Sequence, residues 1–323
     1  MKFIDADRVE AALPYPRLVD VLETAFRNGA IAPPRHHHHI PLAGRPEATW
    51  LLMPAITASA PGAATAGPYM GMKSVTVFPD NGARRGKPAI FGVYLLGTTD
   101  TGETLAIMDA TRLTVLRTAA ASALAARYLA RPDASQLVVV GAGALAPYMV
   151  RAHASVRPIR TVRIWNRTPD HAERVAASLR ASLGLDVRAV TDLEAAVREA
   201  DIVSTATMSV EPLVKGAWLK PGAHVDSVGA YRKTMRETDD DLVRRARVFV
   251  DTRAGAFGEA GDILIPIEAG VIGKDAVLAD LYDLTRGAHP GRPSATEITF
   301  FKSVGASIED LAAAVAVYEA QGS

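Results

Sequence analysis

The chain has 323 residues, of which 49% are hydrophobic and 22% charged, and it contains no cysteine. This composition is typical of a globular protein, and the length predicts two domains of about 150 residues each. The 36 Lys and Arg nearly balance the 35 Asp and Glu, so the net charge of +1 predicts no nucleic-acid or membrane partner. The lack of cysteine excludes disulfides, thiolate metal sites and cysteine nucleophiles. The lack of cysteine also fits the cytoplasm. The charged N-terminus predicts no signal peptide, and no stretch is apolar enough for a membrane span.

The first third of the chain is predicted to be a mixed α+β domain. Apolar residues at helical spacing predict a helix over 15–28 that ends at Gly29. An Ala-rich helix is expected over 112–129. Short runs separated by Gly and Pro predict an antiparallel sheet or partial barrel with strands at 36–42, 49–56, 72–78, 90–97 and 104–109.

From residue 136 the pattern changes to strands that alternate with helices, which predicts βαβ units and a parallel sheet. The strands are expected at 136–140, 162–165, 187–190, 202–205, 224–228 and 248–251. The helices between them are expected at 144–155, 169–183 and 192–200. The last segment, 294–321, is predicted to be mostly helical and to return to the first domain.

A glycine-rich loop carries the clearest chemical signal. Residues 137–146 read LVVVGAGALA, which matches G-x-G-x-x-A between a strand and a helix. Gly141 permits the tight turn, Gly143 lets the backbone approach a pyrophosphate, and Ala146 allows close packing of helix on strand. The phosphates would lie on the amides of the helix N-terminus, so the motif predicts dinucleotide binding; a purely structural turn is the alternative.

The end of the second strand bears on which dinucleotide is bound. NAD sites place a carboxylate about 20 residues after the loop, where it accepts the ribose hydroxyls. This chain has Asn166, Arg167 and Thr168 there instead. An arginine can hold a 2′-phosphate in a bidentate pair, so NADPH is preferred and NADH is the second choice. A solvated turn is the alternative reading of this triplet.

Several segments together resemble the ornithine cyclodeaminase/μ-crystallin family. They are residues 73–75 with 81–88 downstream, 113–120, 165–168, 259–262 and 298–305. The resemblance extends from Pro34 to Asp310 and implies a homodimer. It also implies an α/β fold with a Rossmann NAD(P)-binding domain over 116–297. The α+β substrate and dimerisation domain would span 1–115, joined by the C-terminal segment 298–323.

The resemblance also implies a substrate site. Arg35, Lys73 and Arg117 correspond to the ligands of the substrate carboxylate, with Lys73 and Arg117 expected to be catalytic. Ser303, Val304 and Gly305 would lie near the substrate. Lys73 and Arg117 occur in otherwise apolar segments, where a buried charge requires an anionic partner. An internal ion pair or a solvated side chain is the alternative for each.

The same resemblance places Thr118 at the cofactor phosphates and residues 226–229 near the nicotinamide. The full set of expected cofactor-binding residues is Thr118, Gly141, Gly143, Ala144, Leu145, Asn166, Arg167, Thr168, Thr205, Thr207, Ser227, Val228 and Gly229.

One departure from the family pattern concerns the reaction. Ornithine cyclodeaminases have an acidic residue shortly after the Val-Gly pair, which handles protons during ammonia loss, but this chain has Tyr231 there. The phenol of tyrosine keeps its proton at neutral pH and cannot replace a carboxylate base. The departure favours the family's imine reductases, and residues 143–147 (GALAP) look most like the Δ1-pyrroline-2-carboxylate reductases of hydroxyproline breakdown.

The predicted function is NADPH-dependent reduction of a cyclic imino acid to L-proline or L-pipecolate. The substrate would be Δ1-pyrroline-2-carboxylate or its six-membered piperideine analogue. Three alternatives stay open: an ornithine cyclodeaminase, an amino-acid dehydrogenase, and a non-enzymatic NADP-dependent binding protein of μ-crystallin type.

Other polar clusters are given structural roles. His36–His39 would form a strand beside the substrate pocket, and no metal site is predicted, because no cysteine or carboxylate cluster lies nearby in the sequence. Asp239–Asp241 is expected to be a solvated helix start. Glu259 and Asp262 are assigned either proton handling or loop capping.

Overall fold

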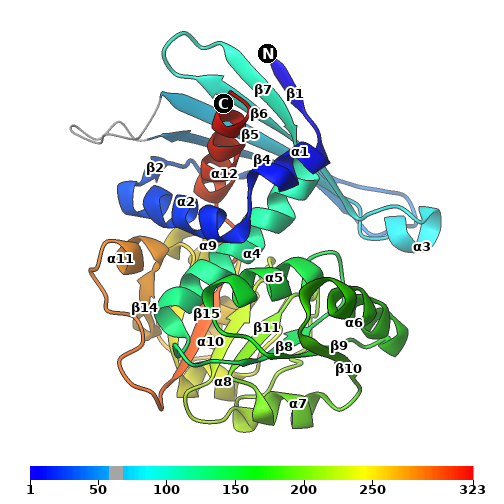
Figure 1. Cartoon of the computed structure of the whole chain (residues 1–323), viewed down its shortest axis with the longest axis vertical. Helices are drawn as coiled ribbons and strands as arrows, with labels where there is room; N and C mark the ends of the chain where they lie inside the picture. The colour runs from blue at the N-terminus through cyan, green and yellow to red at the C-terminus, as the bar shows by residue number, and fades with distance from the viewer. Residues whose placement is uncertain (58–67, 323) are drawn as a thin grey trace. The chain divides into compact units, whose positions relative to one another are not determined.

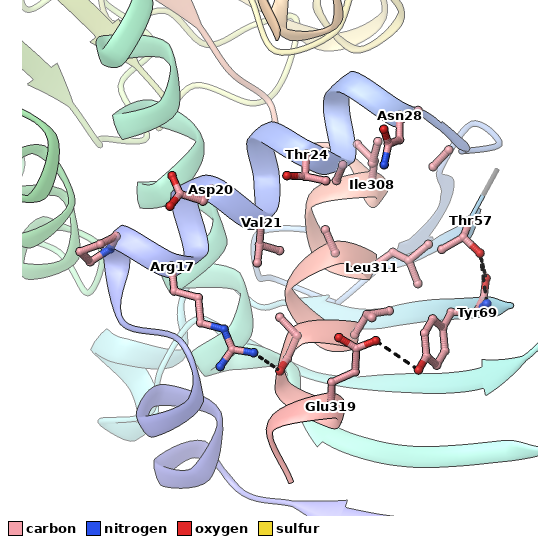
Figure 2. A pocket seen from close by; sticks show the side chains of 17 residues that line it. Arg17, Asp20, Val21, Thr24, Asn28, Thr57, Tyr69, Ile308, Leu311 and Glu319 are labelled. Carbon is pink, nitrogen blue, oxygen red and sulfur yellow. Dashed lines mark hydrogen bonds between the residues drawn. The ribbon is translucent and has the colours of Figure 1, made fainter. Parts of the chain in front are cut away.

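The computed structural model describes residues 1–57 and 68–322 and divides the chain into two compact units. Unit 1 comprises Met1–Arg117 and Ala306–Ser323, and unit 2 comprises Thr118–Gly305. The long helix α4 (Ala110–Leu129) contributes to both, because the division falls within it. Each unit is built around its own sheet (Figure 1).

The sheet of unit 1 has the strand order β1-β7-β6-β5-β4-β2, with β3 paired to β4. All its pairings are antiparallel except that β1 runs parallel to β7. The strands are β1 (Lys2–Ile4), β2 (Ala30–Ile31), β3 (His36–Ile40), β4 (Ala48–Thr57), β5 (Tyr69–Val77), β6 (Ile90–Thr98) and β7 (Thr104–Asp109). The predicted strands are confirmed, and β1 and β2 are additions at the edges.

One face of this sheet is buried, and strand alternation determines which side chains lie on it. Along β5, Lys73, Val75 and Val77 are buried while their neighbours are partly exposed. Helix α12 (Ser307–Ala320) contacts β4, β5 and β6, and it also contacts α2 (Tyr15–Asn28), as the red and blue helices in Figure 1 show. The remaining helices of unit 1 are α1 (Ala6–Ala12) and α3 (Asn81–Arg85).

The sheet of unit 2 consists of eight parallel strands in the order β10-β9-β8-β11-β12-β15-β13-β14. The strands are β8 (Gln136–Val140), β9 (Thr161–Trp165), β10 (Asp186–Val190), β11 (Ile202–Thr205), β12 (His224–Ser227), β13 (Ala246–Val250), β14 (Val277–Asp280) and β15 (Ile298–Lys302). Together the two sheets confirm the predicted fold class, a Rossmann domain with an α+β domain.

Helices cover both faces of this parallel sheet, as its apolar strands require. One core cluster joins the strands to α4, α5 and α6, and the other joins them to α7, α8, α9 and α10. The helices are α5 (Ala146–Val156), α6 (Pro169–Leu183), α7 (Leu193–Glu199), α8 (Asp240–Arg245), α9 (Arg253–Glu259), α10 (Gly261–Glu268) and α11 (Leu281–Thr285), with 3₁₀ turns η1 (Gly216–Trp218) and η2 (Lys274–Ala276). No helix in the described ranges is both long and apolar enough to cross a bilayer.

The strand order reverses direction between β8 and β11. From β8 the chain proceeds outward to β9 and β10, and it then returns to β11 on the other side of β8. The loops that follow β8 and β11 therefore lead away from each other. In open parallel sheets a ligand crevice forms at the carboxyl ends of the strands at such a point.

The prediction of a mostly helical segment over 294–321 is wrong for Ile298–Lys302, which is β15. This strand pairs with β12 and β13 inside the second sheet, so it does not join the first domain as expected. All five residues are buried. A short, continuously apolar run can be a buried strand or a helix, and here the β-branched and aromatic residues Ile298, Thr299, Phe300 and Phe301 favour the strand.

Candidate functional site

The glycine loop of unit 2 has the geometry that a bound pyrophosphate requires. Gly141 has φ = 107°, and a Cβ there would lie 2.8 Å from the carbonyl oxygen of Ala206, so no larger residue fits. A Cβ on Gly143 would meet nothing within 4 Å, which leaves the backbone open on that side. Gly141 is thus required by the fold, while Gly143 leaves room for a ligand.

The start of α5 supplies the donors for an anion. Helix α5 begins at Ala146, and no hydrogen bond to another residue of the described chain engages the N–H groups of Gly143, Ala144 or Leu145. Unpaired N–H groups at a helix N-terminus attract negative charge. The loop therefore fits the phosphates of a dinucleotide, which these three N–H groups would bind.

At the end of β9 the three predicted residues differ in their availability. The side-chain oxygen of Asn166 accepts a hydrogen bond from the Ala142 N–H at 3.2 Å, and its amide nitrogen donates to the Thr168 carbonyl at 2.9 Å. Asn166 thus braces the glycine loop. Arg167 is exposed and makes no ion pair or hydrogen bond within the described part of the chain. Its guanidinium is the one cationic donor of the triplet.

In the loop after β11 and at the end of β12, polar side chains form hydrogen bonds to Glu237 within unit 2. Thr207 donates both its N–H and its hydroxyl to Glu237, at 2.6 and 2.7 Å. The Ser227 hydroxyl donates to the same carboxylate at 2.7 Å. Thr205 is fully buried and accepts the Val228 N–H through its carbonyl at 3.0 Å. The side-chain hydroxyls of Thr207 and Ser227 are therefore already bound to Glu237 within unit 2.

A second buried carboxylate fixes the predicted Ser303-Val304-Gly305 loop. Asp251, directly after β13, accepts the Ser303 hydroxyl at 3.0 Å and the N–H groups of Val304 and Gly305 at 2.8 and 2.7 Å. Gly305 has φ = 80°, which favours glycine. Asp251 was not among the predicted site residues, because its only signal was an acidic residue at the end of an apolar strand.

In unit 1 the two predicted catalytic cations share a partner. Lys73 is 1% exposed, and its Nζ lies 2.9 and 2.8 Å from the two carboxylate oxygens of Asp310. Arg117 is 4% exposed and donates from Nε to Asp310 at 2.8 Å and from Nη1 to Glu309 at 2.7 Å. The internal ion pairs left open by the sequence are thus present, and the structure brings Lys73 and Arg117 together on one carboxylate.

The two carboxylates come from the first turn of α12, where both are fully buried. A helix N-terminus favours negative charge, which offsets part of the cost of burying Glu309 and Asp310. Neither residue was among the predicted site residues. Their only signal was an acidic pair inside an otherwise apolar helix.

Burial and neighbouring charges set the proton affinities in this cluster. Burial lowers the pKa of Lys73 to about 8, with the Arg117 charge acting in the same direction and Asp310 opposing it. Arg35, which is partly buried, lies close enough for its charge to lower the pKa of Lys73 further. For Arg117, burial alone would lower the pKa, but Asp310 and Glu309 outweigh burial and raise it.

Four further predicted groups remain: Thr118, Tyr231, the histidine run and the acidic run at 239–241. Thr118, partly exposed, follows Arg117 directly on α4, and Tyr231 is partly exposed with the Arg232 guanidinium 5.5 Å from its ring centre. His36–His39 form β3 as expected, and no group of three His, Asp or Glu side chains in the described residues could hold a metal. Asp239 caps α8 by accepting the Leu242 N–H, which confirms the predicted helix start.

The shared carboxylate leads to a stability prediction. Asp310→Asn leaves two buried cations without their common partner, so we expect a loss of about 3–5 kcal/mol in the free energy of unfolding. The matched control is Glu23→Gln, which removes a half-exposed pair with Arg27 and should cost less than about 1 kcal/mol. Urea denaturation measures both. Equal losses for the two variants would show that Asp310 does not hold the cluster together.

A model of the ornithine cyclodeaminase/mu-crystallin family matches residues 2–323. The chain is 46% identical over 242 residues to the Delta(1)-pyrroline-2-carboxylate reductase of Paracoccus denitrificans, covering 75% of this chain and 76% of that protein.

Two solved structures show the same fold. The Delta(1)-pyrroline-2-carboxylate reductase of Thermococcus litoralis, in complex with NADH and L-proline, superposes with a TM-score of 0.92 at 32% identity, covering 99% of this chain and 97% of that one. An archaeal alanine dehydrogenase dimer with bound NAD gives a TM-score of 0.87 at 30% identity, covering 98% and 94%. With the matched family model and the geometry above, the chain belongs to the ornithine cyclodeaminase/mu-crystallin family.

Proposed function

We propose that this protein is an NADPH-dependent reductase of a cyclic imino acid. The substrate is Δ1-pyrroline-2-carboxylate, with the six-membered piperideine analogue as a second substrate, and the products are L-proline and L-pipecolate. The observation that carries the proposal is the buried pair of cations, Lys73 and Arg117, on the single carboxylate of Asp310. The relatives named Delta(1)-pyrroline-2-carboxylate reductase are imine-reducing oxidoreductases, and the protein is an enzyme of this class.

The cluster offers cations to a substrate carboxylate. Lys73 and Arg117 are buried against Asp310 and Glu309, and Arg35 lies close enough for its charge to act on Lys73. Arginine can hold a carboxylate in a planar, bidentate pair, which fixes the orientation of the neighbouring imine carbon.

Reduction of a C=N bond adds a hydride to carbon and a proton to nitrogen. A bound reduced nicotinamide supplies the hydride. The chain supplies the proton: at neutral pH the Lys73 ammonium, with a pKa of about 8, is mostly charged and can donate toward the ring nitrogen. Asp310 holds the ammonium in place, and burial keeps water from competing for it.

Direct assays with both cyclic imines test the function. We expect one NADPH to be oxidised for each molecule of imine that is reduced to the cyclic amino acid, with either ring. Lys73→Met should abolish turnover, because the proton donor is lost, while NADPH still binds; Lys215→Met, whose ammonium lies over Trp218, serves as the control and should keep full activity.

Each of the other outcomes would contradict the proposal in its own way. Ammonia release from ornithine without net nicotinamide turnover indicates a cyclodeaminase. Oxidation only when free ammonia or an amine is added indicates an amino-acid dehydrogenase. NADPH binding without turnover of either ring indicates a binding protein.

The choice of NADPH rests on Arg167. Its exposed guanidinium beside the glycine loop would pair with the 2′-phosphate, and no carboxylate is present at 166–168 to bind a ribose hydroxyl. A charge-assisted hydrogen bond contributes about 1.5–3 kcal/mol, which corresponds to roughly 10–100-fold in affinity. We expect Arg167→Ala to weaken NADPH by that factor and NADH by less than about twofold.

Fluorescence titration measures both affinities. Arg174→Ala, an exposed arginine on α6, is the matched control and should change neither. Equal weakening of NADPH and NADH by Arg167→Ala would overturn the NADPH assignment.

We propose that the protein forms a homodimer in the cytoplasm. One face of the unit 1 sheet exposes Trp50, Phe91 and Val93, at 41%, 44% and 46%, and strand register places Trp50, Thr76 and Phe91 in one row. Exposed apolar side chains grouped on one face are typical of an interface. Light scattering should give twice the mass of the chain, and the mass of a single chain would contradict the dimer.

A further inference from the structure

Glu237 lies between β12 and α8, and it is fully buried. Its carboxylate accepts five hydrogen bonds from two separate loops. One oxygen accepts the N–H and hydroxyl of Thr207, from the loop after β11. The other accepts the Ser227 hydroxyl at 2.7 Å and the N–H groups of Gly229 and Ala230 at 2.9 and 3.2 Å, from the end of β12 and the loop after it.

These two loops touch each other through their backbones. A Cβ on Gly229 would lie 1.9 Å from the carbonyl oxygen of Thr207. Ala206, which precedes Thr207, leaves no room for a Cβ on Gly141. The loops after β8, β11 and β12 therefore pack against one another, and a shift in one would displace its neighbour.

The backbone of Glu237 is held in place by a second buried carboxylate, Asp262. Its N–H donates to Asp262 at 2.8 Å, and Asp262 also accepts the N–H and hydroxyl of Thr238 at 3.0 and 2.9 Å. Lys302, at the end of β15, lies 3.1 Å from Asp262 and donates to the Ser227 hydroxyl at 3.3 Å. All of these groups are buried, so the network is shielded from water.

We infer that Glu237 is a positioning residue for dinucleotide binding, which clamps the loops after β11 and β12 in their binding shape before the cofactor arrives. A site that is ordered in advance does not lose loop entropy on binding, so its affinity is higher. The inference rests on the dinucleotide part of the proposed function and is independent of the imine substrate.

The test is Glu237→Gln, which keeps the size of the side chain but turns one acceptor into a donor that faces other donors. In the cofactor-free protein we expect amide hydrogen exchange over 205–211 and 227–232 to quicken about tenfold, with other segments unchanged. The dissociation constants of NADPH and NADP⁺ should both rise about tenfold. Glu194→Gln, an exposed residue on α7, is the matched control and should leave both measurements unchanged.

Unchanged exchange in the two loops, or affinities within twofold of the parent protein, would overturn the inference. If Glu237→Gln does not fold, Thr207→Val replaces it, because it removes one of the five donors. Exchange over 227–232 should then still quicken without cofactor, and no change there would overturn the clamp. Neither measurement uses a substrate, so a failure of imine reduction leaves this test intact.

Discussion

The carboxylate of Asp310 is the constraint on which the core of unit 1 depends. It binds Lys73 with both oxygens and Arg117 with one, at 2.8 to 2.9 Å. Two cations this deeply buried would repel each other and destabilise unit 1 without a shared anion. Because Asp310 and Glu309 belong to α12, this helix has to return to the sheet before the two cations can be buried.

Unit 2 is organised by the same principle at its crevice. Glu237 and Asp251 are buried carboxylates that accept N–H and hydroxyl groups from loops at the carboxyl ends of strands. Loop backbone leaves N–H groups to be satisfied outside helix and sheet, and the two oxygens of one carboxylate accept several donors at once. The geometry of the predicted loop residues is thus set by two carboxylates, Glu237 and Asp251, that were not predicted from the sequence.

The features that could be predicted are local in sequence. The loop around Gly141 lies between a strand and a helix that its own pattern predicts, and the positive φ there needs a glycine. Lys73 was singled out by the family resemblance, and the apolar residues around it agree with a buried charge that needs a partner. The partner Asp310 is 237 positions away, and no pattern connects the two. In sequence, Glu309-Asp310 is also no different from the solvated start of a helix such as Asp239–Asp241.

We propose that the Lys73 ammonium, held by Asp310, supplies the proton, and the pH dependence of kcat/KM tests this role. The pKa of about 8 keeps Lys73 charged below that pH, so kcat/KM should be constant there and fall tenfold per unit above it. Because Asp310 raises the pKa of Lys73, Asp310→Asn, measured where it remains folded, should move the fall to lower pH. If the fall came from ionisation of the free substrate instead, Asp310→Asn would leave its pH unchanged. A profile without this fall, or one that Asp310→Asn leaves in place, would contradict the account.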